Sequence, residues 1–190
     1  MALRVVVVGI PGVGKTTVVE GVVSRFVGAK LVNFGTLMFE AAQSLKWVKD
    51  RDEMRKMPVE RQKRLQKLAA LRIAKMKEKA IIVDTHLFIR TEEGFWPGLP
   101  FEVVRAMQPT HLVLVVATPE EIAKRRSADP TRARDAVTVE GLREELEVAR
   151  SFLIVSSTLT GAPMLIVRNE QGKAEQVSKS LVSVLEQAKR

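Results

Sequence analysis

The residues whose types and spacing most clearly suggest chemistry follow the pattern G-x-x-x-x-G-K-T near the start of the chain. Glycine has no Cβ, so a glycine-rich loop can turn tightly and point its amide N–H groups inward, toward phosphate oxygens. In such a loop Lys15 reaches the β- and γ-phosphates of a nucleotide, and the hydroxyl of Thr16 ligates Mg²⁺. The pattern therefore predicts a site for a nucleoside triphosphate and its metal ion. It consists of Gly9, Ile10, Pro11, Gly12, Val13, Gly14, Lys15, Thr16 and Thr17.

Two elements must hold this loop in place. The β-branched run from Val5 to Val8 precedes it and is typical of a buried parallel strand. A helical pattern follows it, and the N-terminus of that helix adds positive potential where phosphates would lie. An incidental glycine turn with an exposed lysine is the alternative, but the spacing, the strand and the helix argue against it. The apolar positions on one side of the expected helix are Val18, Val19, Val22, Val23 and Phe26.

Another apolar run, from Ala80 to Asp84, ends in an acidic residue that is a candidate metal ligand. An aspartate at the end of such a strand lies beside the phosphate loop and holds Mg²⁺, directly or through water, whereas the alternative is an aspartate that only caps a turn. Thr16 and Asp84 are thus the expected metal ligands. His86 follows two positions later and leaves two interpretations open. It either packs within the fold or projects from the carboxyl end of the strand, where open parallel sheets bind ligands.

Arginines are the candidates for holding a second anionic substrate. The chain has no histidine-arginine-aspartate pattern to supply the general base from which a hydroxyl acceptor benefits. A phosphate acceptor needs no such base, because it is largely dianionic at neutral pH. The obstacle is then repulsion between two polyanions, which guanidinium groups relieve because they stay protonated and grip phosphate. The candidates are Arg55 on the expected acceptor side, and Arg125, Arg126, Arg132 and Arg134 around a polar segment.

That polar segment, residues 127–137, lacks periodicity and is expected to act as a short lid over the donor. Closure of a lid would expel water, strengthen the electrostatic interactions and suppress hydrolysis. A solvated surface is the alternative for each arginine.

Strands alternate with helices through the whole chain. Further strands are expected at 30–34, 80–84, 111–116 and 163–167, and residues 91–98 are expected to form a loop. Helices are expected at 36–45, 50–56, 58–76, 101–107, from 119, at 138–160 and after 172. The alternation predicts an α/β fold, a three-layer α/β/α sandwich with a central parallel five-stranded sheet. Expected inward-facing helix residues are Leu65, Leu68, Ala69, Ile73 and Met76, and in the last helix Val177, Leu181, Val184 and Leu185.

Composition narrows the class of protein. The 190 residues carry a net charge of +9, which suits nucleic acid, an anionic membrane or polyanionic small substrates as partners. Aromatic residues make up only 5% and do not interleave with a basic patch, so nucleic acid is not favoured. No apolar run approaches the roughly 20 residues of a bilayer span, and the first strand leaves no room for a secretory signal. The absence of cysteine excludes disulfides and thiolate metal sites, so we expect a cytoplasmic protein with no membrane partner.

Five segments together resemble the archaeal adenylate kinases. They are Val32–Glu40 (VNFGTLMFE), Arg51–Lys56 (RDEMRK), Asp84–His86 (DTH), Pro97–Pro100 (PGLP) and Thr131–Asp135 (TRARD). The resemblance implies the reaction ATP + AMP ⇌ 2 ADP, dependence on Mg²⁺ and, as in several members, a homotrimer. It also implies a P-loop kinase fold in one domain over residues 1–190, with a monophosphate-binding part at about 33–79 and the lid at about 127–137.

The resemblance assigns roles to individual residues. Arg125 would stack on the adenine of ATP, and the backbone of 169–172 would border it. Lys15, Arg126, Arg132 and Arg134 would be the catalytic groups at the phosphates. Bacterial and eukaryotic adenylate kinases have an AMP-gripping arginine where this chain has Phe39, so Arg55 and Arg90 are both candidates for the AMP phosphate. The implied AMP site comprises Asn33, Gly35, Thr36, Met38, Arg55 and His86.

Two other functions stay open at this point. The first is a kinase for another monophosphate such as CMP, UMP or GMP, because a few pocket contacts decide the base. The second is a basic P-loop ATPase associated with RNA or ribosomes, which would bind RNA with steep salt dependence.

Overall fold

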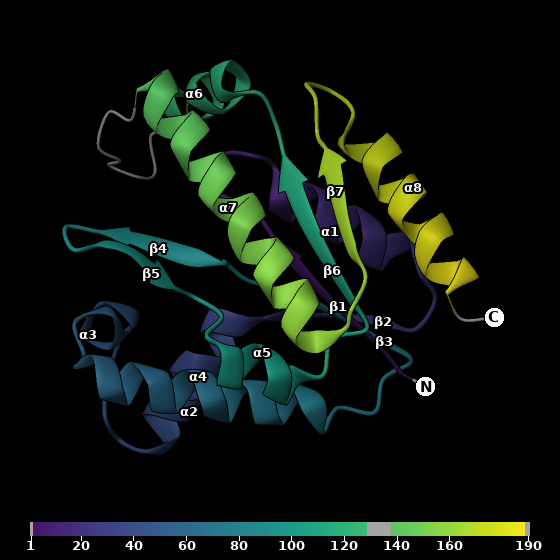
Figure 1. The fold of residues 1–190 in the computed structure, drawn as a ribbon. Coiled ribbons are helices and arrows are strands. Elements are labelled where there is room, and N and C mark those ends of the chain that lie inside the picture. The colour runs from purple at the N-terminus through teal and green to yellow at the C-terminus, as the bar shows by residue number, and fades with distance from the viewer. Residues whose placement is uncertain (1, 129–137, 189–190) are drawn as a thin grey trace.

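A computed structural model describes residues 2–128 and 138–188 (Figure 1). At its centre lies a sheet in which every neighbouring pair of strands is parallel. The strand order is β2-β3-β1-β6-β7, which confirms the predicted parallel five-stranded sheet. The strands are β1 (Leu3–Val8), β2 (Ala29–Asn33), β3 (Ala80–Asp84), β6 (His111–Val116) and β7 (Met164–Arg168).

The middle of the sheet is buried on both faces. The valines of β1 and the isoleucines of β3 are at most 2% exposed, as are the aliphatic residues 112–115 of β6. Such continuous apolar runs are typical of parallel strands with helices on both sides. In the register, Asp84 lies opposite Val7 of β1 and opposite Asn33 of β2. The carboxyl ends of these three strands therefore meet at one edge of the sheet, where the phosphate loop begins.

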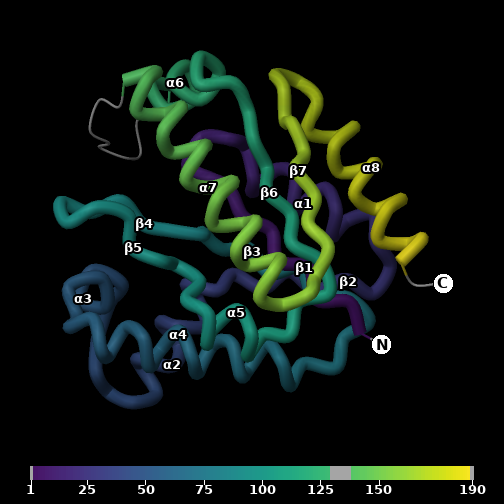
Figure 2. Tube along the Cα trace, in the orientation of Figure 1, coloured from purple at the N-terminus to yellow at the C-terminus, as the bar shows by residue number. Residues whose placement is uncertain are grey.

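Helices cover both faces of the sheet, which confirms the predicted three layers. The long helix α7 (Val139–Thr160) crosses one face, and α1 (Lys15–Arg25) with α8 (Ala174–Gln187) covers the other (Figure 2). The hydroxyl of Ser178 is buried between α8 and α1 and donates to the carbonyl oxygen of Val18 at 3.0 Å. Within residues 2–128 and 138–188, no helix combines the length and the apolar character that crossing a membrane needs.

Most predicted helices are confirmed, but two of the predicted inward-facing residues are not. Helix α7 ends at Thr160, and Gly161 follows it with φ +70°, a common end for a helix. Leu68 and Val184 are 38% and 37% exposed, so the prediction that they face inward was wrong. Both lie at the border of an apolar stripe, where the sequence period does not show how far the neighbouring element extends.

Beyond the β2 side of the sheet, three helices form a smaller unit with its own apolar cluster. Arg61 and Arg64 place their guanidinium groups about 5.2 and 5.3 Å from the ring of Trp47, beside this cluster. Helix α5 (Phe101–Met107) connects the unit to the main core by packing on α4. The three helices are α2 (Phe34–Ser44), α3 (Arg51–Arg55) and α4 (Val59–Ala74). The cluster contains Ala42, Val48, Met57 and Leu65.

The segment predicted as a loop at 91–98 is largely a β-hairpin. Strands β4 (Phe88–Thr91) and β5 (Gly94–Pro97) pair in antiparallel fashion. The prediction was wrong because the paired segments, FIRT and GFWP, show no alternation of apolar and polar residues, and the turn residues Gly94, Pro97 and Gly98 favour a loop. Figure 1 shows the hairpin extending from the sheet between α7 and the α2–α4 unit.

We predict that Gly98→Ala destabilises the protein. An alanine Cβ at this position would lie 2.4 Å from the carbonyl oxygen of His86, a backbone atom that cannot move aside easily. Overpacking of this kind costs about 1–3 kcal/mol, measurable as a lower midpoint in thermal unfolding. The control is Gly35→Ala in the first turn of α2, where the Cβ would lie 3.4 Å from the nearest atom. An equal loss of stability in both variants would contradict the explanation.

Candidate nucleotide-binding site

The phosphate loop connects β1 to α1, and its backbone requires glycine at two positions. Gly12 and Gly14 have φ of +91° and +79°, values that residues with side chains rarely adopt. Gly14 is also the N-cap of α1. Because glycine has no side chain with which to cap the first helical amides, these N–H groups stay available to an anion.

Lys15 and Asp84 form an ion pair at the end of the loop. Lys15 is 8% exposed, and this burial lowers the pKa of its side chain to about 8. The other oxygen of Asp84 accepts a hydrogen bond from Nδ2 of Asn33 at 3.1 Å. The three residues meet because β3 lies between β1 and β2 in the sheet. The structure thus brings together residues predicted for the donor, the metal and the acceptor.

Oxygen ligands suited to Mg²⁺ lie beside the loop. The Asp84 carboxylate stands at its end, and Thr16 is exposed in the first turn of α1. Mg²⁺ favours oxygen ligands and is commonly held by one or two carboxylates together with substrate phosphates. In the described ranges, no three His, Cys, Asp or Glu residues cluster in a way that could hold a metal. This donor set fits a Mg²⁺ ion that is bound jointly by the protein and a nucleotide.

Arg125 connects the loop to the turn that follows β7. Its guanidinium donates to the carbonyl oxygens of Val13 at 3.2 Å and Asn169 at 3.0 Å. The side chain of Asn169 is buried and donates to the same Val13 carbonyl at 2.9 Å. Arg125 therefore lies where the 169–172 turn approaches the phosphate loop, although the role of the Asn169 side chain was not predicted.

Helix α6 (Pro119–Ser127), which carries Arg125, is held by a capping box. Thr118 caps the helix, and Glu121 accepts hydrogen bonds from the Thr118 and Gln171 backbone amides at 3.1 and 2.7 Å. These bonds, led by that of Thr118, lower the pKa of Glu121. The start of α6 and the turn after β7 are therefore fixed to each other.

Arg126 lies on the other side of the loop, in a largely buried ion pair. Its Nε donates to the carbonyl oxygen of Pro11 at 2.9 Å, and its Nη2 lies 2.8 Å from Oε2 of Glu145. The Arg126 and Glu145 side chains are 11% and 7% exposed. Sequence reasoning missed Glu145, which lies in α7 among other acidic residues that are solvent-exposed. Only its burial distinguishes it.

On the predicted acceptor side, Asn33 caps α2. Its Oδ1 accepts from the backbone N–H of Thr36 at 3.0 Å, and Arg51 donates to the Thr36 hydroxyl at 2.8 Å. The Arg51 guanidinium also lies 5.4 Å from the ring centre of Phe39. Arg51 was not predicted as a site residue, although it belongs to the RDEMRK segment that carries the resemblance. The predicted residues Gly35 and Met38 are partly buried in the same helix.

Arg55 is separated from this cluster. It pairs with Asp52 at 2.8 Å and is exposed. Together with Gln62 and Trp96, it lines a cavity of about 770 Å³ between α4 and the β4–β5 hairpin. The other predicted acceptor residues do not line this cavity. Arg90, the alternative candidate, lies on the opposite face of the hairpin and contacts Glu145, with 3.6 Å between Nη1 and Oε1.

His86 lies next to the phosphate loop, with an exposed side chain. It shares a small cavity of about 20 Å³ with Gly9, Ile10 and Pro11. It follows the carboxyl end of β3, two positions after Asp84. Arg132 and Arg134, and nearly all of the predicted lid, lie outside the described residues.

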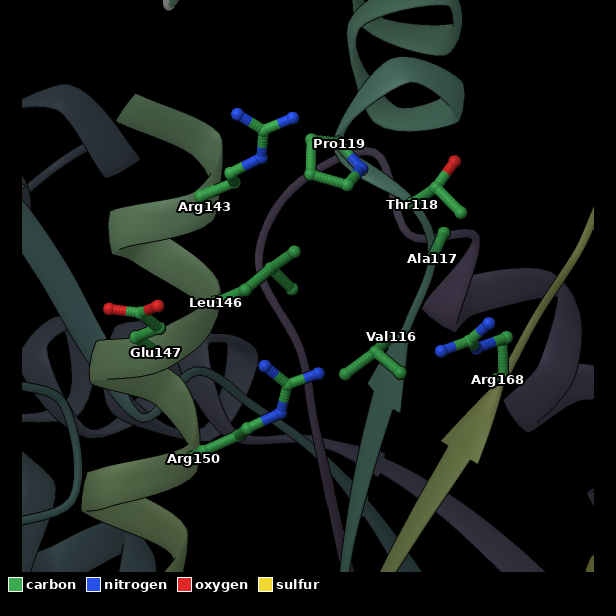
Figure 3. A pocket seen from close by; sticks show the side chains of 9 residues that line it. All are labelled: Val116, Ala117, Thr118, Pro119, Arg143, Leu146, Glu147, Arg150 and Arg168. Carbon is green, nitrogen blue, oxygen red and sulfur yellow. The ribbon is translucent and has the colours of Figure 1, made fainter. Parts of the chain in front are cut away.

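A further pocket lies between α7 and the carboxyl ends of β6 and β7 (Figure 3). It measures about 230 Å³, and none of the predicted site residues lines it. Figure 3 shows the guanidinium groups of Arg150 and Arg168 on either side of Val116. Arg143, at its upper rim, pairs with Glu140 at 3.0 Å. This pocket is therefore separate from the phosphate loop.

Comparison with known proteins identifies the family. A family model described as an AAA domain matches residues 8–143. An adenylate kinase from Thermoplasma acidophilum is 43% identical over 183 residues, covering 96% of this chain and 98% of that protein. An adenylate kinase from Methanoculleus marisnigri is 46% identical over 187 residues, covering 96% and 97%.

Among solved structures, a shikimate kinase from Bacteroides thetaiotaomicron aligns with a TM-score of 0.61 and 13% sequence identity. The alignment covers 97% of this chain and 98% of that one. At this identity the likeness shows the fold alone, a P-loop kinase fold. The similarity to these adenylate kinases extends over nearly the whole chain. The chain belongs to the adenylate kinase family.

Proposed function

We propose that this protein transfers the γ-phosphoryl group of ATP to AMP, reversibly, giving two ADP. The observation that carries the proposal is the contact between Lys15, Asp84 and Asn33. It joins the loop that binds donor phosphates to the cap of the helix on the acceptor side. A nucleotide hydrolase transfers the phosphoryl group to water and would need no helix that holds a second nucleotide.

The proposed reaction depends on cations rather than on a base. Lys15, Arg125 and Arg126 surround the loop, and phosphate oxygens would replace their present protein partners. Arg132 and Arg134 stay predicted contacts of the transferring phosphoryl group. Thr16 and Asp84 would hold Mg²⁺, which supplies positive charge to the phosphate oxygens.

The acceptor would lie between the α2 cap and the cavity of Arg55. We assign AMP to Asn33, Gly35, Thr36, Met38, Arg55 and His86, with Arg51 added because it donates to Thr36. A volume of about 770 Å³ is sufficient for a nucleoside, and Trp96 offers a ring on which a base can stack. Residues 33–79 would thus be the monophosphate-binding part of a single domain, and 127–137 its lid. The absence of cysteine supports a cytoplasmic location.

A coupled assay with AMP, CMP, UMP and GMP tests this function. We expect AMP to be the preferred acceptor, with activity lost on removal of Mg²⁺. Lys15→Ala should lower kcat by at least about 10²-fold, because a preorganised charge at the phosphates is lost. Lys179→Ala, which removes an exposed lysine paired with Glu175, is the matched control. Faster turnover of another monophosphate, or salt-sensitive RNA binding without phosphoryl transfer, would overturn the proposal.

The pKa of Lys15 predicts a pH dependence. Because burial lowers this pKa to about 8, the free enzyme should lose the Lys15 charge as the pH rises above that value. kcat/KM for ATP, which reports the free enzyme, should then fall by about tenfold per pH unit. Lys15→Arg should be less active but should lack this alkaline decrease, since arginine stays protonated. The same decrease in both proteins would exclude Lys15 as its cause.

We also propose that the chain forms a homotrimer, as its resemblance to archaeal adenylate kinases implies. One surface suits contact with further copies of this chain, and we call it the α7–β7 surface. Strand β7 is an edge of the central sheet, and Met164 and Ile166 on it are 40% and 46% exposed. The end of α7 adds Ile154, Val155 and Leu159, each at least 48% exposed. Contiguous apolar surface of this kind commonly marks a protein interface.

Light scattering after gel filtration tests the assembly. We expect a mass about three times the 21.2 kDa of one chain. Ile154→Glu combined with Ile166→Glu should give monomers, since two charges would be buried at the interface. Leu71→Glu, at an exposed apolar position of α4, is the control and should leave the mass unchanged. A monomeric wild type, or a trimer in the double variant, would contradict the proposal.

A further inference from the structure

The β4–β5 hairpin has two faces with different neighbours. Side chains alternate along a strand, and residues paired across an antiparallel ladder share a face. Ile89 and Trp96 are such a pair, and both line the cavity of Arg55. Arg90 and Phe95 are the next pair and point to the other face, toward α7. The hairpin therefore lies between the proposed acceptor cavity and helix α7, with one face toward each.

The α7 face of the hairpin is packed and charged. The rings of Phe88 and Phe95 lie 5.0 Å apart edge to face, and Phe88 also meets Phe152 of α7 at 5.8 Å. The Arg90 guanidinium lies 5.6 Å from the Phe95 ring centre. These contacts direct Arg90 at the carboxylate of Glu145.

Glu145 divides its two oxygens between two arginines. Oε1 lies 3.6 Å from Nη1 of Arg90, and Oε2 lies 2.8 Å from Nη2 of Arg126. The residue is 5% exposed, so water offers little alternative solvation for its charge. Arg126 in turn donates to the carbonyl oxygen of Pro11 in the phosphate loop. Continuous contacts thus connect the hairpin, α7, α6 and the loop.

We propose that Glu145 is a positioning residue that couples the acceptor cavity to the donor site. It holds Arg126 at the phosphate loop while no nucleotide is bound. A ligand that orders the hairpin strengthens the contact of Arg90 with Glu145, and this releases the Arg126 guanidinium to donor phosphates. The inference rests on the proposed function, because it takes AMP as the ligand of the cavity and ATP as that of the loop.

Coupling of this kind is reciprocal, so each nucleotide should tighten binding of the other. Calorimetric titration of the full chain with AMP, with and without the non-hydrolysable analogue adenylyl imidodiphosphate, measures it. In wild type we expect the analogue to tighten AMP binding by about fivefold or more. Glu145→Gln should abolish most of this increase, while AMP alone binds within about threefold of wild type.

The matched control is Glu144→Gln. Glu144 is the neighbouring carboxylate, exposed and 3.9 Å from the same Arg90, and its loss should leave the coupling intact. A purely structural role of Glu145 would lower stability and weaken both ligands without changing their mutual effect. Retained coupling in folded Glu145→Gln would overturn the inference.

Arg90→Gln provides a second test that does not disturb a buried position. It should lose the coupling as Glu145→Gln does, and the double variant should lose no more than either single variant. Additive losses would show that the two residues act separately and would contradict the inference. Failure of wild type to turn over AMP would instead contradict the proposed function, so the two failures are distinguishable.

Discussion

A buried ammonium group is costly unless a counter-charge accompanies it, and Lys15 obtains one from Asp84. This pairing depends on the register of the parallel sheet, which places Asp84 opposite Val7 just before the loop. A slip of one residue would turn Asp84 to the other face of the sheet. Asn33 then extends the pairing, because one end of its amide contacts Asp84 and the other caps α2. The start of α2 is thus set by the same strands that position the loop.

Arg126 repeats this arrangement on the other side of the loop, with Glu145 as its carboxylate. Both cations are therefore positioned and desolvated before any nucleotide binds. In the proposed reaction this matters more than proton transfer, because the barrier to bringing ATP and AMP together is repulsion between their phosphates. Charges already in place need little reorganisation when the ligands arrive. The protein partners that hold them are carboxylates, which phosphate can replace.

The fold alone does not define this chemistry. The shikimate kinase from Bacteroides thetaiotaomicron shares the architecture over nearly the whole chain at 13% identity. What differs between members of such a fold are the groups around the common loop. In this chain those groups include the hairpin, which lines the Arg55 cavity with one face and contacts helix α7 with the other.

The five parallel strands, the phosphate loop and most helices could be predicted from the sequence because they depend on local properties. Glycine spacing, β-branched runs and helical periodicity act over a few residues, and Asp84 was recognisable from the strand that it ends. The hairpin was missed because each of its strands is only 4 residues long and lacks an apolar–polar alternation.

The sequence by itself determined where the phosphate loop lies, since the glycine spacing, the preceding strand and the following helix are all local features. Only the tertiary structure decided that Glu145 is the buried acidic residue of its helix and that Leu68 and Val184 are exposed. It also decided that Arg90 faces α7 rather than the Arg55 cavity. These properties depend on contacts between residues far apart in the chain, and a pattern that is read along the chain does not contain them.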